Sequence, residues 1–313
     1  FTRYLVAELV ASYGDRHFTV YYQVETLIAG RAVERALQPE RFIVGCGDSG
    51  KTLPGPYQKL LNAFDCPILK MGYESAELTK AAINLFLASS VSATNTIAEL
   101  CEATGAEWSD IVPALRSDKR IGPHAYLNPG LGISGGNLER DLVTIGALAR
   151  ESGTDPQVAD ALISHARYRR DWALKTVHSQ VISRCANPAF GIWGLAYKPD
   201  TASTKNSPSL ALVDALDPFS IRVYDPQVAL NTSGLASVVQ VETALEACTG
   251  ADALVVMTPW AEFSSVELGR VRELMAGTVI VNPFGALDRD RCSEWGFQHF
   301  KLGSPAKAPE LVK

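Results

Sequence analysis

A long stretch from Glu74 to about Ala103 contains neither proline nor glycine and repeats small and apolar residues every three or four positions. The repeating positions are Leu78, Ala82, Leu85, Ala88 and Ser92. This spacing predicts one continuous helix. A helix of about 30 residues is about 45 Å long, more than one small helical domain can cover on every side. We therefore expect the helix to be the spine of a helical domain and to form most of a homodimer interface.

The residues before this helix predict part of an α/β unit that starts with a helix. FTRYLVAELVASYG carries apolar residues at helical spacing and ends at Gly14, a residue type that commonly ends helices. HFTVYYQ then predicts a strand, residues 31–37 a short helix that ends before Pro39, and RFIVG a second strand.

The residues after the long helix predict more helices and then a second α/β domain. Helices are expected from Asp141 to Glu151 and from Gln157 to about Ile182, behind a glycine-rich loop, NPGLGISGGN. Beyond Pro188, the runs FGIWGLA, IRVYDP, ADALVVMT and TVIVNP predict four strands separated by helices or loops. Strands that alternate with helices are typical of a parallel sheet wound with helices. The predicted fold class is therefore α/β.

The stretch IVGCGDSGKT, residues 43–52, satisfies two phosphate-binding patterns at once, G-x-x-x-x-G-K-[ST] and G-x-G-x-x-G. Both patterns need a helix that opens directly after the loop, because the first N–H groups of that helix hold the phosphate. Here Pro54-Gly55-Pro56 follows, which removes two backbone donors and favours extended geometry. We therefore expect Pro54 and Pro56 in a non-helical loop, and a strand end with a surface turn in place of a phosphate site.

Composition narrows the function classes. Charged residues make up 20% of the chain and the net charge is -5, which argues against a nucleic-acid-binding surface. No apolar run reaches the ~20 residues that span a bilayer, and the first residues lack the layout of a signal peptide, so we expect a cytoplasmic protein without a membrane segment. The six cysteines form no C-x-x-C pair and the five histidines show no metal-binding spacing, which predicts reduced thiols and no metal site.

Three separated motifs resemble the UDP-glucose/GDP-mannose dehydrogenase family. They are the helix ESAELTKAAINLFLASSVSATNTIAELC, the segment RIGPHAYLNPGLGISGGNLERDL and the segment GLAYKPDTASTKNSPS. The stretches VETLIAGRAVERALQPERFIVG, VYDP and ADALVVMTPWAEF add support, and the match covers nearly all of the 313 residues. Several spaced motifs in the family's order are far more specific than a lone glycine pattern.

The resemblance implies three parts. Residues 1–70 correspond to the C-terminal part of an NAD-binding Rossmann domain, residues 71–184 to a central helical dimerisation domain, and residues 185–313 to a C-terminal Rossmann-like domain that binds the nucleotide sugar. It also implies NAD as the cofactor, a nucleotide-diphosphate sugar as the substrate, and a homodimer. The strand and glycine turn that hold the NAD pyrophosphate in the family have no counterpart in this sequence, so NAD is expected from the resemblance alone.

Lys80 and Asn84 lie four residues apart on the long helix and therefore share one face. The resemblance implies that they hold an ordered water or an oxyanion beside the reacting sugar carbon, since an ammonium and an amide stabilise developing negative charge. It implies that Asp141 partners the lysine and helps to relay a proton. Without the resemblance, Lys80 and Asn84 also read as solvated helix residues, and Asp141 as a helix cap.

Asn137 is the largest departure from the family pattern. The resemblance implies a cysteine at this position, whose thiolate attacks an aldehyde and forms a thioester in a second oxidation, and an amide cannot do this. Glu25 matches a glutamate that activates water in that oxidation, but a further family glutamate is replaced by Ala29. Arg140 keeps the charge of a family lysine with a different donor geometry.

The resemblance places the substrate along the glycine-rich loop, where glycines let the backbone come close to the sugar and diphosphate. It implies an arginine offered to the neighbouring active site of the dimer and basic residues near the nucleotide. The expected substrate-binding residues are Arg120, Tyr126, Leu127, Asn128, Gly132, Gly135, Lys198 and Lys205. In the last strand, Asn282-Pro283-Phe284 replaces the family's Asp-Gly-Arg, which removes one charged contact.

Two functions remain open on the sequence. The first is an NAD-dependent oxidoreductase that oxidises an alcohol of a nucleotide-diphosphate sugar without the cysteine thioester step, which the retained Lys80, Asn84 and Asp141 favour. The alternative is a non-catalytic nucleotide-sugar-binding homologue, which Asn137, Ala29 and Phe284 favour. Reduction of NAD in the presence of nucleotide sugars separates the two.

Overall fold

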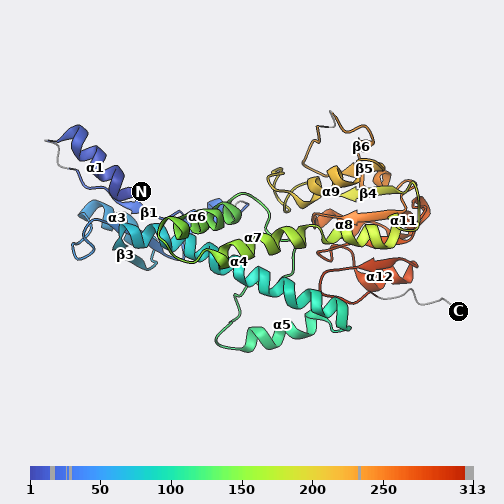
Figure 1. Ribbon diagram of the computed structural model, residues 1–313, viewed down its shortest axis with the longest axis horizontal. Coiled ribbons are helices and arrows are strands. Elements are labelled where there is room, and N and C mark those ends of the chain that lie inside the picture. The colour runs from blue at the N-terminus through green and yellow to red at the C-terminus, as the bar shows by residue number, and fades with distance from the viewer. Residues whose placement is uncertain (15–17, 26, 28–29, 232–233, 307–313) are drawn as a thin grey trace. The chain divides into compact units, whose positions relative to one another are not determined.

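The computed structural model describes residues 1–306 except 15–17, 26, 28–29 and 232–233 (Figure 1). The chain forms two compact units, residues 1–86 and residues 87–313. The division into residues 1–70, 71–184 and 185–313 stays a prediction.

The first unit holds a three-stranded sheet in the order β1-β2-β3. Strand β1 (Tyr22–Gln23) pairs antiparallel with β2 (Phe42–Cys46), and β2 pairs in parallel with β3 (Ile68–Gly72) through the crossover helix α3 (Gly55–Asn62). Helix α1 (Thr2–Tyr13), the short α2 (Ala32–Leu37) and the first part of the long helix after β3, up to residue 86, belong to the same unit. The helix before Gly14, the short helix and the RFIVG strand are confirmed, whereas the first predicted strand shrinks to two residues.

The expectation of a non-helical loop holds for Pro54, whose ψ of 139 is extended, but it is wrong for Pro56, which is helical. Pro54 precedes the first residue of α3 and Pro56 lies in its first turn, where the missing N–H has no partner within the helix in any case. The loop still lacks P-loop geometry, because three residues separate Lys51 from the start of α3 and the Gly50 N–H donates to the Asp48 carboxylate at 2.9 Å. The absence of a phosphate at residues 45–52 stays a prediction.

The long helix α4 (Tyr73–Thr104) confirms the helix that the sequence predicts. Its side chains Phe86 and Leu78 are 75% and 51% exposed, and Ile97 and Leu100 are exposed as well. By length and composition alone this helix is able to cross a membrane, since an 18-residue window reaches a mean hydropathy of 1.2. One such helix is weak evidence. The homodimer and the lack of a membrane segment stay predictions.

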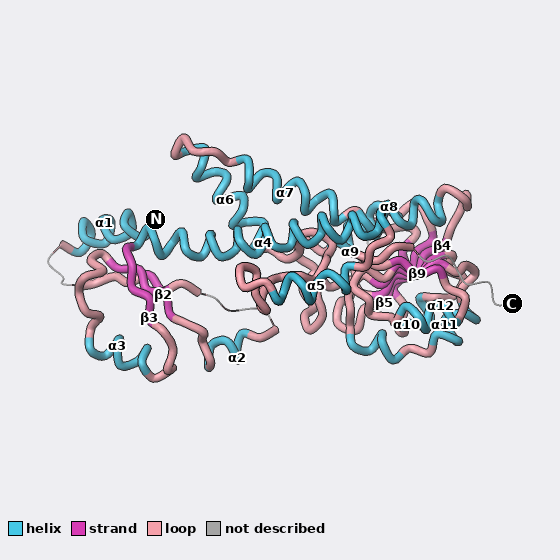
Figure 2. The backbone as a smooth tube through the Cα atoms, turned by 90° about the horizontal axis from the view of Figure 1, so that it is seen from below, coloured by secondary structure: helices cyan, strands magenta, loops and turns pink. Residues whose placement is uncertain are grey.

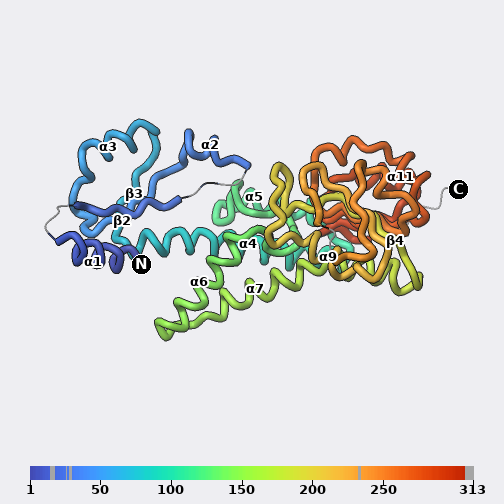
Figure 3. The backbone as a smooth tube through the Cα atoms, turned by 90° about the horizontal axis from the view of Figure 1, so that it is seen from above, coloured from blue at the N-terminus to red at the C-terminus, as the bar shows by residue number. Residues whose placement is uncertain are grey.

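Helices α5 (Trp108–Ser117), α6 (Asn137–Glu151) and α7 (Gln157–Arg170) open the second unit, and α6 and α7 form a helical hairpin (Figure 3). The single helix predicted from Gln157 to Ile182 is broken. The backbone leaves helical geometry at Asp171, after which α8 (Trp172–Val177) and a π-helix, η1 (His178–Ile182), continue the chain. Aspartate favours caps over helix interiors, and a break of one residue hardly changes the apolar spacing.

The rest of the second unit is a six-stranded, fully parallel sheet in the order β6-β5-β4-β7-β8-β9. Figure 2 shows its strands in magenta and labels β4, β5 and β9. Its strands are β4 (Ala189–Trp193), β5 (Ser220–Tyr224), β6 (Val238–Gln240), β7 (Ala253–Val256), β8 (Val279–Val281) and β9 (Gln298–Phe300). The connecting helices are α9 (Pro208–Leu216), α10 (Ala244–Ala247), η2 (Ala261–Ser265), α11 (Leu268–Leu274) and α12 (Arg289–Glu294).

This strand order is that of a doubly wound Rossmann sheet, whose ligands bind at the carboxyl ends of the strands. All four predicted strands are confirmed. Strands β7 and β8 are buried along their full length, as expected of central parallel strands. The carboxyl edge is braced by Asp225, whose buried carboxylate accepts hydrogen bonds from the backbone of Leu195, Ala196, Gln227 and Val228 and from the Trp260 indole.

Candidate functional site: a glycine loop beside a nucleotide pocket

The glycine-rich loop is tied to the second half of α4 by buried polar side chains. The Thr94 hydroxyl donates to the Tyr126 carbonyl at 2.9 Å, and the Gly130 N–H donates to the Asn95 carboxamide at 2.8 Å. Thr94 and Asn95 are 2% and 1% exposed. The Trp108 indole donates to the Leu127 carbonyl at 2.8 Å. Thr94, Asn95 and Trp108 were not predicted as anchors of the loop, although polar residues at inward positions of an apolar helix, as at Thr94 and Asn95, are a signal for such contacts.

Gly132 and Gly135 hold the loop close to its neighbours. Both have positive φ, and a Cβ on Gly132 would lie 2.0 Å from the Ala166 carbonyl oxygen of α7. A Cβ on Gly135 would lie 3.2 Å from the Tyr197 ring. Glycine alone fits both positions without strain. The structure thus gives these two predicted residues a definite steric role, while their role toward a substrate stays a prediction.

The end of the loop meets the segment that carries Lys198 and Lys205. The Gly135 N–H donates to the Lys205 carbonyl at 3.2 Å, and the Asn206 carboxamide donates to the Gly135 carbonyl at 2.9 Å. The Lys205 side chain extends across Gly136, with its Cε 2.4 Å from the place of a Cβ on that glycine. Lys205 is therefore brought next to the first residue of α6. The half-buried Lys198 lies with its ammonium 5.6 Å from the centre of the Tyr197 ring.

Helix α6 begins at Asn137, four residues earlier than predicted, so Asp141 lies in its second turn and not at its start. Asp141 is 9% exposed and accepts a hydrogen bond from the Arg140 guanidinium at 3.2 Å. Asn137 itself is exposed. The start of this helix was predicted four residues late because the segment GGNLERD has no proline or strong capping pattern that marks where the helix begins.

None of the six cysteines lies in the glycine loop or in α6. Burial raises the pKa of Cys248 and of Cys292 to about 12, so both thiols stay protonated at neutral pH. Burial also raises the pKa of Cys101. The structure therefore offers none of these three thiols as a substitute for a nucleophile at Asn137.

Lys80 and Asn84 belong to the first unit, where both side chains are half-buried on α4. Glu25 is exposed, and its carboxylate accepts the Leu27 N–H at 2.6 Å. Ala29 lies outside the described residues. Arg120 is 89% exposed and donates two side-chain hydrogen bonds to Asp118, which lower the pKa of that carboxyl. The catalytic and intersubunit roles of these residues stay predictions.

A cavity of about 520 Å³ lies at the carboxyl ends of β7, β8 and β9, where a doubly wound sheet binds its ligand. Two of the predicted substrate residues, Leu127 and Asn128, are among its walls. Its other lining residues are Glu107, Trp108, Ser109, Val112, Pro129, Pro259, Pro283, Phe284, Lys301 and Leu302. Because the family resemblance implies a nucleotide as part of the ligand, we call this cavity the nucleotide pocket. The structure thus joins the start of the glycine loop to the sheet edge.

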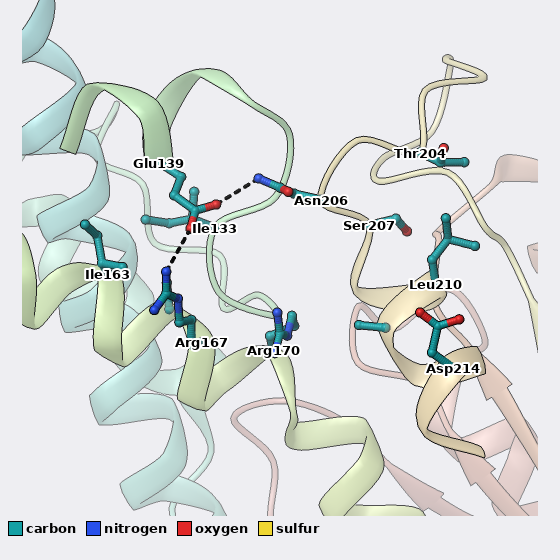
Figure 4. A pocket seen from close by; sticks show the side chains of 12 residues that line it. Ile133, Glu139, Ile163, Arg167, Arg170, Thr204, Asn206, Ser207, Leu210 and Asp214 are labelled. Atoms are coloured by element: carbon teal, nitrogen blue, oxygen red, sulfur yellow. Dashed lines mark hydrogen bonds and ion pairs between the residues drawn. The ribbon is translucent and has the colours of Figure 1, made fainter. Parts of the chain in front are cut away.

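A second cavity, of about 420 Å³, lies between α7 and α9 and is lined on one side by Ile133 of the glycine loop (Figure 4). Glu139 of α6 lies at the edge of this cavity and contacts two other lining residues. Its carboxylate accepts a hydrogen bond from Asn206 at 2.8 Å and lies 3.6 Å from the Arg167 guanidinium (Figure 4). Because Asn206 also holds the Gly135 carbonyl, Glu139 fixes the 203–206 segment to α6. Neither Glu139 nor Asn206 was predicted from the sequence as a site residue.

Within the residues that the structure describes, no three histidine, cysteine, aspartate or glutamate side chains gather closely enough to hold a metal ion. The expectation of a protein without a metal stays a prediction.

A doubly wound parallel sheet with a cavity at its carboxyl edge and a glycine-rich loop beside it is the architecture of a Rossmann-like α/β protein. The models of two domains match: the central domain of the UDP-glucose/GDP-mannose dehydrogenase family over residues 74–166 and its UDP binding domain over residues 191–289. The chain belongs to the UDP-glucose/GDP-mannose dehydrogenase family. The resemblance inferred from the motifs is thereby confirmed.

Curated relatives include a UDP-glucose 6-dehydrogenase of Pseudomonas aeruginosa, 30% identical over 292 residues, and one of Bacillus subtilis, 29% identical over 304 residues. The alignments cover 90% and 95% of this chain but 64% of each relative. Among solved structures, a UDP-glucose dehydrogenase of Pyrobaculum islandicum matches with a TM-score of 0.80 at 25% identity, over 96% of this chain and 67% of that one. A UDP-D-ManNAc dehydrogenase of Pyrococcus horikoshii shares the fold, with a TM-score of 0.80 at 22% identity.

Proposed function

We propose that the protein is an NAD-dependent oxidoreductase that oxidises an alcohol of a nucleotide-diphosphate sugar and stops before the thioester step. One observation carries the proposal. A single glycine loop runs from the nucleotide pocket at Leu127 and Asn128 to the start of α6 at Asn137. A nucleotide held in the pocket would extend its diphosphate along this loop and bring its sugar to the start of α6.

The diphosphate has a suitable partner at the far end of the loop. Lys205 lies across Gly136, and its ammonium provides the positive charge that a diphosphate needs. Lys198, on the same segment, adds a second cation. Gly132 and Gly135 leave room for the ligand because they carry no side chains. Arg120, on an exposed loop, is offered to the site of a second copy in a homodimer.

The chemistry at the sugar rests on Lys80, Asn84 and Asp141. In the proposed reaction, Lys80 and Asn84 stabilise the oxyanion that develops as the alcohol loses its proton. Asp141, which is mostly buried and contacts Arg140, relays that proton. Asn137 occupies the position of the family nucleophile without a thiol, so the carbonyl product is released and Glu25 has no thioester to help hydrolyse.

NAD supplies the hydride acceptor when it is bound. The residues 45–50, which match the dinucleotide pattern, do not fit its pyrophosphate, because the Asp48 carboxylate occupies the Gly50 N–H and α3 begins only at Gly55. No residue of this chain is therefore assigned to NAD, and the cofactor rests on membership of the family. A cytoplasmic location is part of the same proposal.

A second candidate is a non-catalytic homologue that binds nucleotide sugars. The exposed amide of Asn137 favours it, because an amide at this position cannot carry out the family's covalent chemistry, and the buried thiols of Cys248 and Cys292 do not replace it. This candidate keeps the nucleotide pocket and gives up the redox step.

The proposal is tested by incubating the purified protein with NAD and UDP-, GDP- or TDP-sugars and measuring the absorbance of the NADH that forms. The oxidoreductase produces NADH with at least one sugar and loses this activity in Lys80→Met and Asp141→Asn. A protein that binds one of these sugars in calorimetry but forms no NADH is the non-catalytic homologue. Light scattering at micromolar concentration tests the homodimer, and a monomer would contradict it.

A further inference from the structure

We propose that Phe284 is the stacking platform for the nucleobase and determines how the pocket recognises its nucleotide. This inference rests on the proposed function, because it concerns the ligand of the same pocket. Phe284 lies three residues after β8 and is half-buried at the carboxyl edge of the sheet, where it lines the pocket. A Cβ on Gly130 would lie 3.9 Å from its Cε1 atom, so the edge of the ring is close to the glycine loop.

The pocket around Phe284 suits a flat aromatic ligand. Its apolar walls include the Trp108 indole and the prolines Pro129, Pro259 and Pro283. The carboxylate of Glu107, which also lines the pocket, accepts hydrogen bonds from Arg289 and from Ser304, so both of its oxygens have partners within the protein. Flat apolar surfaces favour binding of a nucleobase, whereas the ammonium of Lys205 and the nearby glycine amides favour binding of phosphates. We therefore expect the base at the start of the glycine loop and the phosphates near its end.

Phe284 is presented by a rigid turn. Asn282 is fully buried, its carboxamide donates to the Leu287 carbonyl at 2.8 Å, and its oxygen accepts the Ala286 N–H at 2.9 Å. The Gly285 N–H donates to the Asn282 carbonyl at 3.1 Å. A turn fixed on both sides of Phe284 loses little conformational entropy when a base stacks on the ring. The Asn282-Pro283-Phe284 segment is thus a preorganised platform, and not merely a site that has lost a charge.

Calorimetric titration of the wild-type protein and three variants with UDP tests this assignment. Phe284→Leu removes the aromatic face with little change in volume, Phe284→Tyr keeps the face, and Phe219→Leu is the matched control. Phe219 is also a half-buried aromatic residue of the second unit, but it packs against Phe190 and lies outside the nucleotide pocket. Thermal unfolding of each variant is measured alongside.

We expect Phe284→Leu to weaken UDP binding about 5- to 100-fold, as loss of a base–aromatic stack does. Phe284→Tyr and Phe219→Leu stay within about twofold of the wild type by the same reasoning. Titration with pyrophosphate shows no difference between wild type and Phe284→Leu. If GDP or TDP binds in place of UDP, the same loss in Phe284→Leu supports the assignment equally.

Two results would overturn it. The first is UDP affinity in Phe284→Leu within twofold of the wild type. The second is an equal loss of affinity in Phe219→Leu, which would show a structural effect. If the wild type binds none of UDP, GDP and TDP, the proposed function and this inference fail together. If it binds UDP without oxidising any sugar, only the redox part of the proposed function fails.

Discussion

The side chain of Lys205 lies directly across Gly136, with the lysine Cε 2.4 Å from the place where a Cβ on the glycine would stand. This contact brings a cation from the segment after β4 to the start of α6, although the two residues are far apart in the sequence. Lys205 can keep this position only because residue 136 has no side chain. The position of the Lys205 ammonium, which we propose to bind the diphosphate, therefore depends on the glycine at residue 136.

Gly136→Ala is expected to weaken binding of a nucleotide-diphosphate sugar about tenfold, the loss of one charge-assisted contact, because the new methyl group displaces Lys205. Stability should change by less than about 1 kcal/mol, since Gly136 has a φ of -110 that alanine adopts and the displaced atoms end a flexible chain. Calorimetry on Gly136→Ala, Lys205→Met and the double variant checks this. The double variant should lose no more than either single one, and additive losses would contradict the coupling.

Gly132→Ala is expected to unfold the loop or the protein. Its Cβ would lie 2.0 Å from the backbone oxygen of Ala166, which cannot move without moving α7. Gly153→Ala is the matched control, because Gly153 also has a positive φ but has open space around its Cβ position. The control should cost about 1–2 kcal/mol for the left-handed backbone alone. Chemical denaturation should show a clearly larger loss for Gly132→Ala, and equal losses would refute the steric role.

His299 should make the stability fall between pH 7 and pH 4. Burial, with Arg289 and Lys301 nearby, lowers the pKa of His299 to about 4, and its Nε2 lies 2.9 Å from the Asn282 amide. The neutral ring is therefore preferred in the folded state. This contribution is complete above the unfolded pKa of about 6.5, and roughly 3 kcal/mol is lost as the pH falls to about 4.

The contribution of His299 to the free energy of unfolding is measured by denaturing the wild-type protein and His299→Gln at several pH values. The wild type should lose stability more steeply between pH 6.5 and pH 4 than His299→Gln, which keeps a polar partner for Asn282 and does not titrate. Parallel curves for the two proteins would show that His299 does not titrate in the way its burial requires.

Much of the fold follows from local patterns. The long apolar period of residues 73–104 predicts α4, and four β-rich runs predict β4, β5, β7 and β8. Strands β6 and β9, VVQ and QHF, contain polar residues, so they lack the continuous apolar run that predicts β8, which has the same length of three residues. The helix after Pro54 was missed because two prolines and a glycine argue against helix interiors, while a first turn accepts them.

The site was predicted less completely than the fold. Family motifs pointed to Leu127 and Asn128, which do line the nucleotide pocket, and to Lys205, which does meet the glycine loop. Thr94, Asn95 and Asn206 could not be found in this way, because their roles depend on contacts between distant segments. Phe284 looked like a loss of charge in the sequence, and only the cavity around it indicates an aromatic surface for a ligand.

We propose that the protein carries out a two-electron oxidation without a nucleophile at Asn137. The most direct test counts NADH formed per nucleotide sugar consumed, with mass spectrometry of the sugar product. We predict one NADH per sugar, a carbonyl product and no covalent adduct on the protein, with Asn137→Cys as the variant that restores a thiol at this position. Two NADH per sugar and a uronic acid from the wild-type protein would contradict the account.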